Sequence, residues 1–172
     1  VLWSEDYTAF HGEIAARGPA SGGSVETSSR SNLQALGRVQ VGDGTLSVAP
    51  PRPWNRVRPL RYTDIRVVED WTLNGPYLDG ITFVTGLPNG EYLVRQRRYE
   101  DRQVPKFRSE MLAPEIAAML ESAFRVRGGA VDFNTLALTP RQFMGYPGFQ
   151  LDFEHLDGDE LWRKGRAVGA VI

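Results

Sequence analysis

The sequence predicts an α+β fold in which a helix packs on an antiparallel sheet, and three patterns support this prediction. Residues 148–172 alternate apolar and polar side chains on both sides of a turn, which indicates a β-hairpin. Residues 114–126 place apolar side chains at helical spacing. Residues 35–94 carry short apolar runs between glycine- and proline-containing turns, which is typical of antiparallel strands. We expect an N-terminal arm and linker over residues 1–34 and one α+β domain over residues 35–172.

Composition limits the functions that this chain can perform. Its 172 residues, 41% of them apolar, suffice for one core, and a formal net charge of −1 gives no general reason to expect nucleic acid. The absence of cysteine excludes disulfides, thiolate zinc sites and a cysteine nucleophile. No apolar run approaches the ~18–20 residues of a membrane span. Because the chain begins with Val1, we expect the natural start to lie upstream, where a signal peptide or lipid-carrying cysteine remains possible.

The first fifteen residues resemble one short amphipathic segment. Their apolar side chains recur at roughly helical spacing, at Trp3, Tyr7, Phe10 and Ile14. The segment either packs on its own domain or docks on a partner through the same aromatic side chains. Residues 16–32 are rich in glycine and serine and are expected to be a linker. We expect the arm to make few contacts with its domain and to reach a partner through Trp3, Tyr7 and Phe10.

Two β units are expected before the helix. Val39 to Val48 surround the turn signal Gly42-Asp43-Gly44 and predict a hairpin, which the prolines of residues 50–53 bring to an end. Residues 65–94 predict a meander of three strands, the last of them over Glu91–Val94. The polar, arginine-rich residues 95–108 are expected to be an exposed loop, with an acidic protein partner and RNA as less favoured interpretations.

The helix has recognisable ends and one apolar stripe. Pro114 suits its first turn, Glu115 suits the positive end of the helix dipole, and Gly128-Gly129 suits the stop. The stripe that should pack on the sheet consists of Ile116, Met119, Leu120, Ala123 and Phe124. A strand is expected over residues 131–138, with turns at 139–140 and 146–148.

The last hairpin also predicts its own register. A loop over residues 158–160 places Asp152 opposite Arg166 and Glu154 opposite Lys164, so opposite charges meet on one face. Large side chains meet small ones on the other face: Phe153 with Gly165, Leu151 with Ala167 and Phe149 with Gly169. On the charged face Trp162 should be exposed, and with Arg163 and Arg166 it is a candidate interface anchor.

No catalytic, metal or cofactor motif is present. His155 lies near Glu154, Asp157 and Asp159, a combination that a metal or acid–base site could use. Glu154 and His155 point to opposite faces of a strand, however, and the favoured interpretation is a solvated turn with a half-buried histidine. We therefore expect no catalytic residue, no cofactor and no metal.

The chain from Pro51 to Ile172 also resembles a group of uncharacterised proteobacterial exported proteins, often described as putative lipoproteins. The residues that carry this resemblance are 51–56, 71–76, 81–87, the helix around 114–124, and 148–153. The order of elements is similar to that of the PsbP/Mog1-like fold, an antiparallel sheet with helices on its faces. This resemblance implies an extrinsic subunit of a membrane complex or a small binding module, with one more strand and a closing helix after Ile172.

The sequence thus leads to three functional expectations. The first is a non-enzymatic, exported, periplasmic accessory or scaffold subunit that docks on a membrane-associated protein complex, is tethered through an upstream lipoprotein anchor and binds no nucleic acid. The second is a small-ligand binding module with the ligand between helix 114–126 and the sheet. The third is an uncharacterised hydrolase, which would need His155 to converge with aspartate or serine.

Overall fold

The structure of this chain is a computed structural model, and it describes residues 2–4, 13–16, 34–35, 37–41, 46–57, 69–75, 79–96, 99–126 and 129–172. The elements before the α-helix are β1 (Leu2–Ser4), β2 (Glu13–Ala16), β3 (Gln34–Ala35), β4 (Val39–Val41), β5 (Leu46–Ala49), β6 (Trp54–Val57), β7 (Glu69–Thr72), β8 (Ile81–Phe83) and the 3-10 helix η1 (Tyr99–Gln103). The remaining elements are α1 (Ala113–Val126), β9 (Ala130–Phe143), β10 (Tyr146–Asp157) and β11 (Trp162–Ala170).

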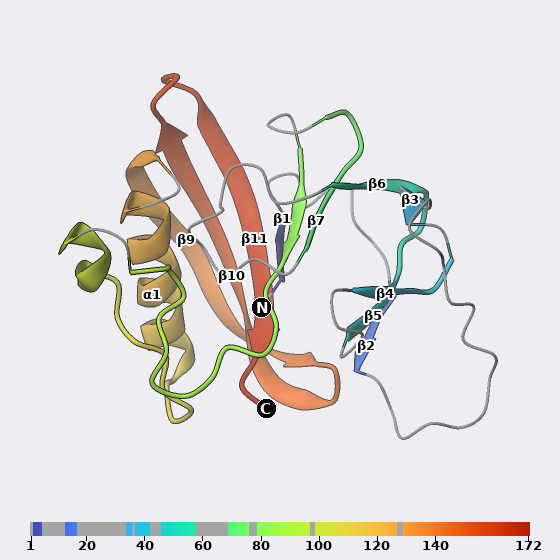
Figure 1. Ribbon diagram of the computed structural model, residues 1–172, viewed down its shortest axis with the longest axis horizontal. Coiled ribbons are helices and arrows are strands. Elements are labelled where there is room, and N and C mark those ends of the chain that lie inside the picture. The colour runs from blue at the N-terminus through green and yellow to red at the C-terminus, as the bar shows by residue number, and fades with distance from the viewer. Residues whose placement is uncertain are drawn as a thin grey trace.

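These elements form a mixed α+β structure, as the sequence predicts. The larger sheet has eight strands in the order β3-β6-β7-β8-β1-β11-β10-β9, and the smaller has three in the order β2-β5-β4. Every described strand pair is antiparallel. Helix α1 lies beside the long strands β9 and β10, and the smaller sheet lies towards the opposite end of the molecule (Figure 1).

Two apolar cores hold these layers together. The first lies under α1 and joins its buried stripe to Phe133, Phe149, Leu151 and Phe153 of β9 and β10. The second joins the two sheets, and its buried members are Ala35, Val41, Leu46, Val48, Trp54, Trp71, Ile81 and Phe83. Because burial of apolar surface is the main favourable term in folding, these cores fix α1 and the smaller sheet on the larger one.

Helix α1 confirms the predicted bounds and the predicted stripe. All five residues expected to face the sheet are buried. Its N-terminus is capped by Glu115, whose carboxylate accepts hydrogen bonds from the Leu112 backbone N–H (2.9 Å) and from the Arg108 guanidinium (2.7 Å). A glutamate three residues into the first turn thus satisfies one of the backbone donors that a helix start leaves without a partner.

The β10–β11 hairpin has the predicted register. Asp152 faces Arg166 and Glu154 faces Lys164, and the three pairs of large and small residues also form as predicted. Gly165 is required here, because a Cβ at this position would lie 2.3 Å from the Phe153 ring. The turn closes with a hydrogen bond of 2.9 Å from the Glu160 N–H to the Asp157 carbonyl, and Glu160 adopts a φ of 63°. This combination is typical of a three-residue hairpin loop.

Strand β9 is longer than predicted, and the turns expected at 139–140 and 146–148 are wrong. The actual turn is Met144-Gly145, with φ of 54° and 83°, the type I′ geometry of a two-residue hairpin. In such a hairpin the closing pair Phe143–Tyr146 is hydrogen bonded. The residue just before Phe143, and every second residue before that one, therefore points its backbone N–H and C=O groups away from β10. Pro140 occupies one of these outward positions, where its missing N–H breaks no bond of the ladder.

The N-terminal residues differ most from the prediction. The expected helical segment is wrong at residues 2–4 and 13–16, which form β1 and β2. The expectation of few contacts is also wrong for them, because β1 pairs with both β8 and β11 in the larger sheet and β2 pairs with β5. Because β1 lies between β8 and β11, it provides hydrogen-bond partners for backbone groups of both strands that would otherwise have none. Of the expected linker over residues 16–32, Ala16 lies in β2, and residues 17–32 lie outside the described residues.

The other two β units are confirmed in part. β4 pairs with β5 as the predicted first hairpin, while its turn lies outside the described residues. β7 pairs with β8 as the meander predicts, but the third strand at 91–94 is wrong. Residues 91–94 form no strand of the larger sheet: Tyr92 makes an isolated bridge with Lys106, and β1 takes the place beside β8.

Candidate functional site

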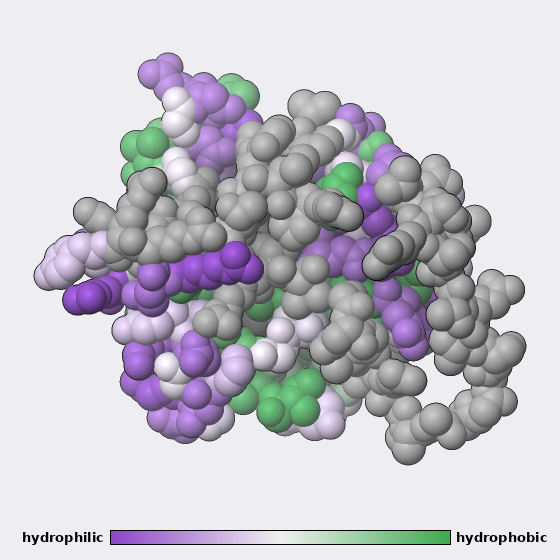
Figure 2. All heavy atoms as spheres, viewed as in Figure 1, coloured by the Kyte–Doolittle hydropathy of each residue, from purple (hydrophilic) through white to green (hydrophobic). Residues whose placement is uncertain are grey.

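An apolar cavity of about 540 Å³ lies at the end of the larger sheet, beside the first half of α1. Its lining comes from α1, Leu46 of β5, the segments 84–93 and 107–109, the β9–β10 turn and the end of the chain. The lining residues are Leu46, Val84, Thr85, Gly86, Leu87, Pro88, Asn89, Leu93, Phe107, Ser109, Ile116, Met119, Leu120, Phe143, Met144, Ala170, Val171 and Ile172. Figure 2 shows an apolar patch where the C-terminal end of the chain lies in Figure 1.

Helix α1 supplies one wall of the cavity. Ile116, Met119 and Leu120 belong to the buried stripe and also line this space, because the helix projects them towards the end of the sheet. Met144 reaches the cavity from the β9–β10 turn, where its left-handed backbone conformation directs the chain back on itself. Two flexible methionine side chains therefore face the same space, and such side chains adapt to irregular ligands.

Short backbone pairings hold the loop wall of the cavity in place. The Gly90 N–H donates to the Phe107 carbonyl and the Phe107 N–H donates to the Glu91 carbonyl, both at 2.8 Å. The Ser109 N–H donates to Asn89 Oδ1 at 3.0 Å. These contacts tie residues 89–91 to residues 107–109 and hold Asn89, Phe107 and Ser109 in the cavity wall.

The lining restricts the chemistry of an occupant. Among the described residues, the cavity lining includes no aspartate, glutamate, lysine or arginine side chain, and its polar side chains are Thr85, Asn89 and Ser109. A charged group placed among apolar side chains without a partner is strongly disfavoured. The cavity therefore suits an uncharged molecule with an apolar body that can also form a few hydrogen bonds with hydroxyl or amide groups of the lining.

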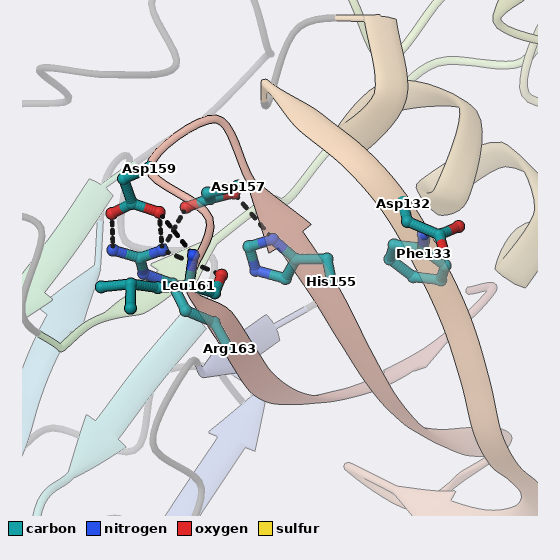
Figure 3. Close-up of polar contacts among 7 residues, drawn as sticks. All are labelled: Asp132, Phe133, His155, Asp157, Asp159, Leu161 and Arg163. Carbon is teal, nitrogen blue, oxygen red and sulfur yellow. Dashed lines mark hydrogen bonds and ion pairs between the residues drawn. The ribbon is translucent and has the colours of Figure 1, made fainter.

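A second cluster of polar side chains surrounds His155 near the β10–β11 turn (Figure 3). The imidazole is fully buried, and its Nδ1 lies 2.9 Å from Asp157 Oδ1, while Nε2 has no hydrogen-bond partner among the described residues. The ring packs against Phe124, with centroids 5.1 Å apart, and against Phe153, with centroids 6.1 Å apart. The expectation of a half-buried histidine in a solvated turn is wrong, because His155 shares the core-facing side of β10.

Arg163 ties this cluster to the hairpin loop. Its guanidinium pairs with Asp157 Oδ2 at 2.9 Å and with Asp159 Oδ2 at 2.7 Å. The hydrogen bond from Arg163 lowers the pKa of Asp159 to about 2. The imidazole, two carboxylates and one guanidinium therefore form a connected network that fixes the loop. With no exposed surface on His155, a substrate has no approach to the imidazole, so this network is suited to holding the turn.

The predicted interface residues of β11 do not share one face. Trp162 is 49% exposed, as predicted, while Arg163 points to the other side and is held by Asp157 and Asp159. Arg166 lies on the same side as Trp162 and is paired with Asp152 through bonds of 2.5 and 3.0 Å. This hydrogen bonding lowers the pKa of the Asp152 carboxyl below its usual value.

The aromatic residues proposed for the N-terminal arm are only partly described. The backbone of Trp3 lies in β1, opposite Ala167 and Thr82, whereas Tyr7 and Phe10 lie outside the described residues. A role of these side chains in partner binding remains a prediction.

Sequence reasoning placed a ligand between the helix and the sheet but missed the loop side of the cavity. Leu87 lies within the segment predicted as a meander, and no pattern in the sequence marks it as part of a ligand site. Met144 was missed because the turn was placed at the neighbouring prolines. The helix residues of the cavity were all within the predicted stripe.

Within the described part of the chain, no helix is long and apolar enough to cross a membrane, and no group of three or more potential metal-ligating side chains is found. Comparisons of this chain with protein families, with curated proteins and with solved structures find no match to any of them.

Proposed function

We propose that this chain is a binding module that holds an uncharged, apolar small molecule in the cavity beside α1. The observation that carries this proposal is the cavity itself. Its volume of about 540 Å³ is within the ~300–1,000 Å³ typical of small-molecule sites, and its described walls are mostly apolar with a few polar side chains. Burial of an apolar ligand there would contribute roughly 25 cal/mol per Å² of apolar surface removed from water.

The hydrolase alternative has less support. His155 does converge with Asp157, which such an enzyme would require. However, the imidazole is fully buried, and its hydrogen-bond partners among the described residues include no serine or threonine that could act as a nucleophile. We therefore favour binding over hydrolysis.

The test is a titration with Nile red, a neutral apolar dye whose fluorescence rises when it leaves water. The parent chain is expected to bind the dye saturably with a stoichiometry of one. Val171→Trp, which adds a large ring to a lining position, is expected to weaken the dye affinity about tenfold or more, since the ring occupies the ligand's space. Val131→Trp introduces the same substitution at an exposed residue outside the cavity and should leave the affinity unchanged.

Two outcomes would contradict the proposal. One is an absence of saturable dye binding by the folded parent chain. The other is an equal loss of affinity in Val171→Trp and Val131→Trp, since the dye would then bind exposed surface and not the cavity. Circular dichroism of each variant checks that it folds.

A second candidate is the accessory subunit that the resemblance implies. We propose, under this alternative, that the β10–β11 tip docks on a membrane-associated protein complex, because Trp162 is 49% exposed and the neighbouring Leu161 is 58% exposed. Export, a periplasmic location, a lipoprotein tether and a PsbP/Mog1-like arrangement belong to the same proposal. The helix that covers one face of an antiparallel sheet is compatible with that arrangement.

The docking alternative predicts that the purified chain sediments with proteobacterial membranes and that protease treatment of those membranes abolishes the binding. Trp162→Ala should reduce the bound fraction several-fold, because aromatic anchors carry much of the energy of an interface. Leu112→Ala changes another exposed apolar residue, before α1, and is the control. Equal binding by parent and Trp162→Ala would rule out this tip as the docking surface.

A further inference from the structure

Strand β9 forms one end of the larger sheet. It pairs with β10 along one side, and no strand of the described chain lies along its other side. It spans Ala130–Phe143, and the stretch from Asn134 to Gln142 is exposed except at Leu138, which is partly buried. An exposed edge of this length presents a row of backbone N–H and C=O groups to any strand that can align with it.

Side chains protect the two flanks of this edge but leave its middle open. At one flank the Phe133 N–H donates to Asp132 Oδ1 at 2.8 Å, and the Phe133 carbonyl accepts from Arg125 at 3.3 Å. At the other flank Pro140 has no N–H to offer. Between them the sequence Asn-Thr-Leu-Ala-Leu-Thr of residues 134–139 carries no charge and no proline, which favours strand pairing.

We propose that β9 pairs antiparallel with β9 of a second copy of this chain, about a two-fold axis between Leu136 and Ala137. The pairing joins the two larger sheets into one continuous sheet. A two-fold axis is the symmetry that most homodimers use, and it makes a strand edge its own partner surface. The proposal concerns a surface on β9 and does not depend on the cavity.

The charges that flank the open segment select this register. The axis places Asp132 of one copy opposite Arg141 of the other, and the symmetry repeats this pair. Asp132 has a half-exposed side chain, so its carboxylate remains accessible beside Arg125. Arg141, which is exposed and contacts Gln150, can reach across the same face. Opposite charges directly across an antiparallel pair stabilise it, and like charges destabilise it.

The backbone directions agree with the same register. Phe133 points its backbone groups away from β10, since Asp132 and Arg125 bind them, and Pro140 points outward by its position in the β9–β10 hairpin. The axis sets Phe133 of one copy opposite Pro140 of the other. The two residues that have fewer backbone groups free to bond a neighbouring strand therefore face each other. It also sets the outward-facing Thr135 opposite Leu138. The β-bulge after Thr135 lies at the axis in both copies. Because both strands carry the same extra residue at this point, the pairing stays in register on both sides of the axis.

The test is sedimentation velocity of the full chain over a range of concentrations. The parent chain is expected to form a dimer. Asp132→Lys and Arg141→Glu each put two like-charged pairs across the axis and are each expected to raise the dissociation constant about tenfold or more. An equimolar mixture of the two variants is expected to restore dimers, because every pair in the heterodimer again joins opposite charges. A merely structural role of either residue would not be rescued by mixing.

Asp132→Lys could fail to fold, because Asp132 also binds Arg125 and the Phe133 N–H. A further variant tests the proposal without changing Asp132. Thr135→Pro removes an outward-pointing N–H from the open segment and is expected to give monomers. A parent chain that stays monomeric, charge variants that dimerise as well as the parent, or a mixture that stays monomeric would each overturn the proposal.

Discussion

Replacing Phe124 by alanine is expected to lower the free energy of unfolding by about 3–5 kcal/mol. Phe124 is 2% exposed and lies at the centre of the core under α1. Its ring is 5.3 Å from that of Phe153, 5.6 Å from that of Phe133 and 5.1 Å from that of His155, measured between centroids. Alanine would leave a cavity bordered by three rings on rigid strands, which cannot move in to fill it.

Urea denaturation followed by circular dichroism measures this loss. Leu112→Ala removes an apolar side chain that is 70% exposed just before α1, and it is expected to change the free energy of unfolding by about 0.5 kcal/mol or less. A loss below about 1 kcal/mol for Phe124→Ala would contradict the packing of α1 on β9 and β10.

Deleting residues 1–4 is expected to destabilise the fold strongly. Leu2–Ser4 lies between β8 and β11, so the deletion separates the larger sheet into two groups of strands. The backbone hydrogen bonds lost on both sides amount to roughly 3–6 kcal/mol at about 1 kcal/mol each, and the neighbours are left with groups that lack partners. Thermal unfolding should therefore shift to a lower temperature or lose its cooperativity.

If the shortened chain melts at the same temperature as the parent, residues 1–4 are a dispensable arm and their place in the sheet is wrong. A second version, in which glycine and serine replace residues 1–4, keeps the chain length and separates loss of the strand from a change at the terminus.

The parts of the fold that were predicted correctly depend on local information. The β10–β11 register follows from residues close in sequence, because Glu154 and Lys164 carry opposite charges and Phe153 requires a glycine opposite it. Helix α1 follows from its own apolar stripe and end signals. β1 could not be found this way, since its partner β11 lies at the other end of the chain and three residues show no reliable period.

Some features of the candidate sites can be predicted from the sequence. The alternation that sends Trp162 and Arg166 to one face sends Arg163 to the other, where it pairs with Asp157. The same alternation places His155 in line with Phe153 on the core side, which explains its burial. The loop wall of the cavity depends on pairings between segments such as Gly90 and Phe107, which no local pattern specifies.

The most direct test of the cavity uses the three methionines of this chain as reporters in the Nile red titration. Met119 and Met144 line the cavity, whereas Met111 is buried in the core under α1 and does not line it. In methyl NMR spectra, assigned with Met→Leu variants, we predict saturable shifts of the Met119 and Met144 signals on addition of dye while the Met111 signal stays in place. Unchanged Met119 and Met144 signals at dye saturation would contradict the account.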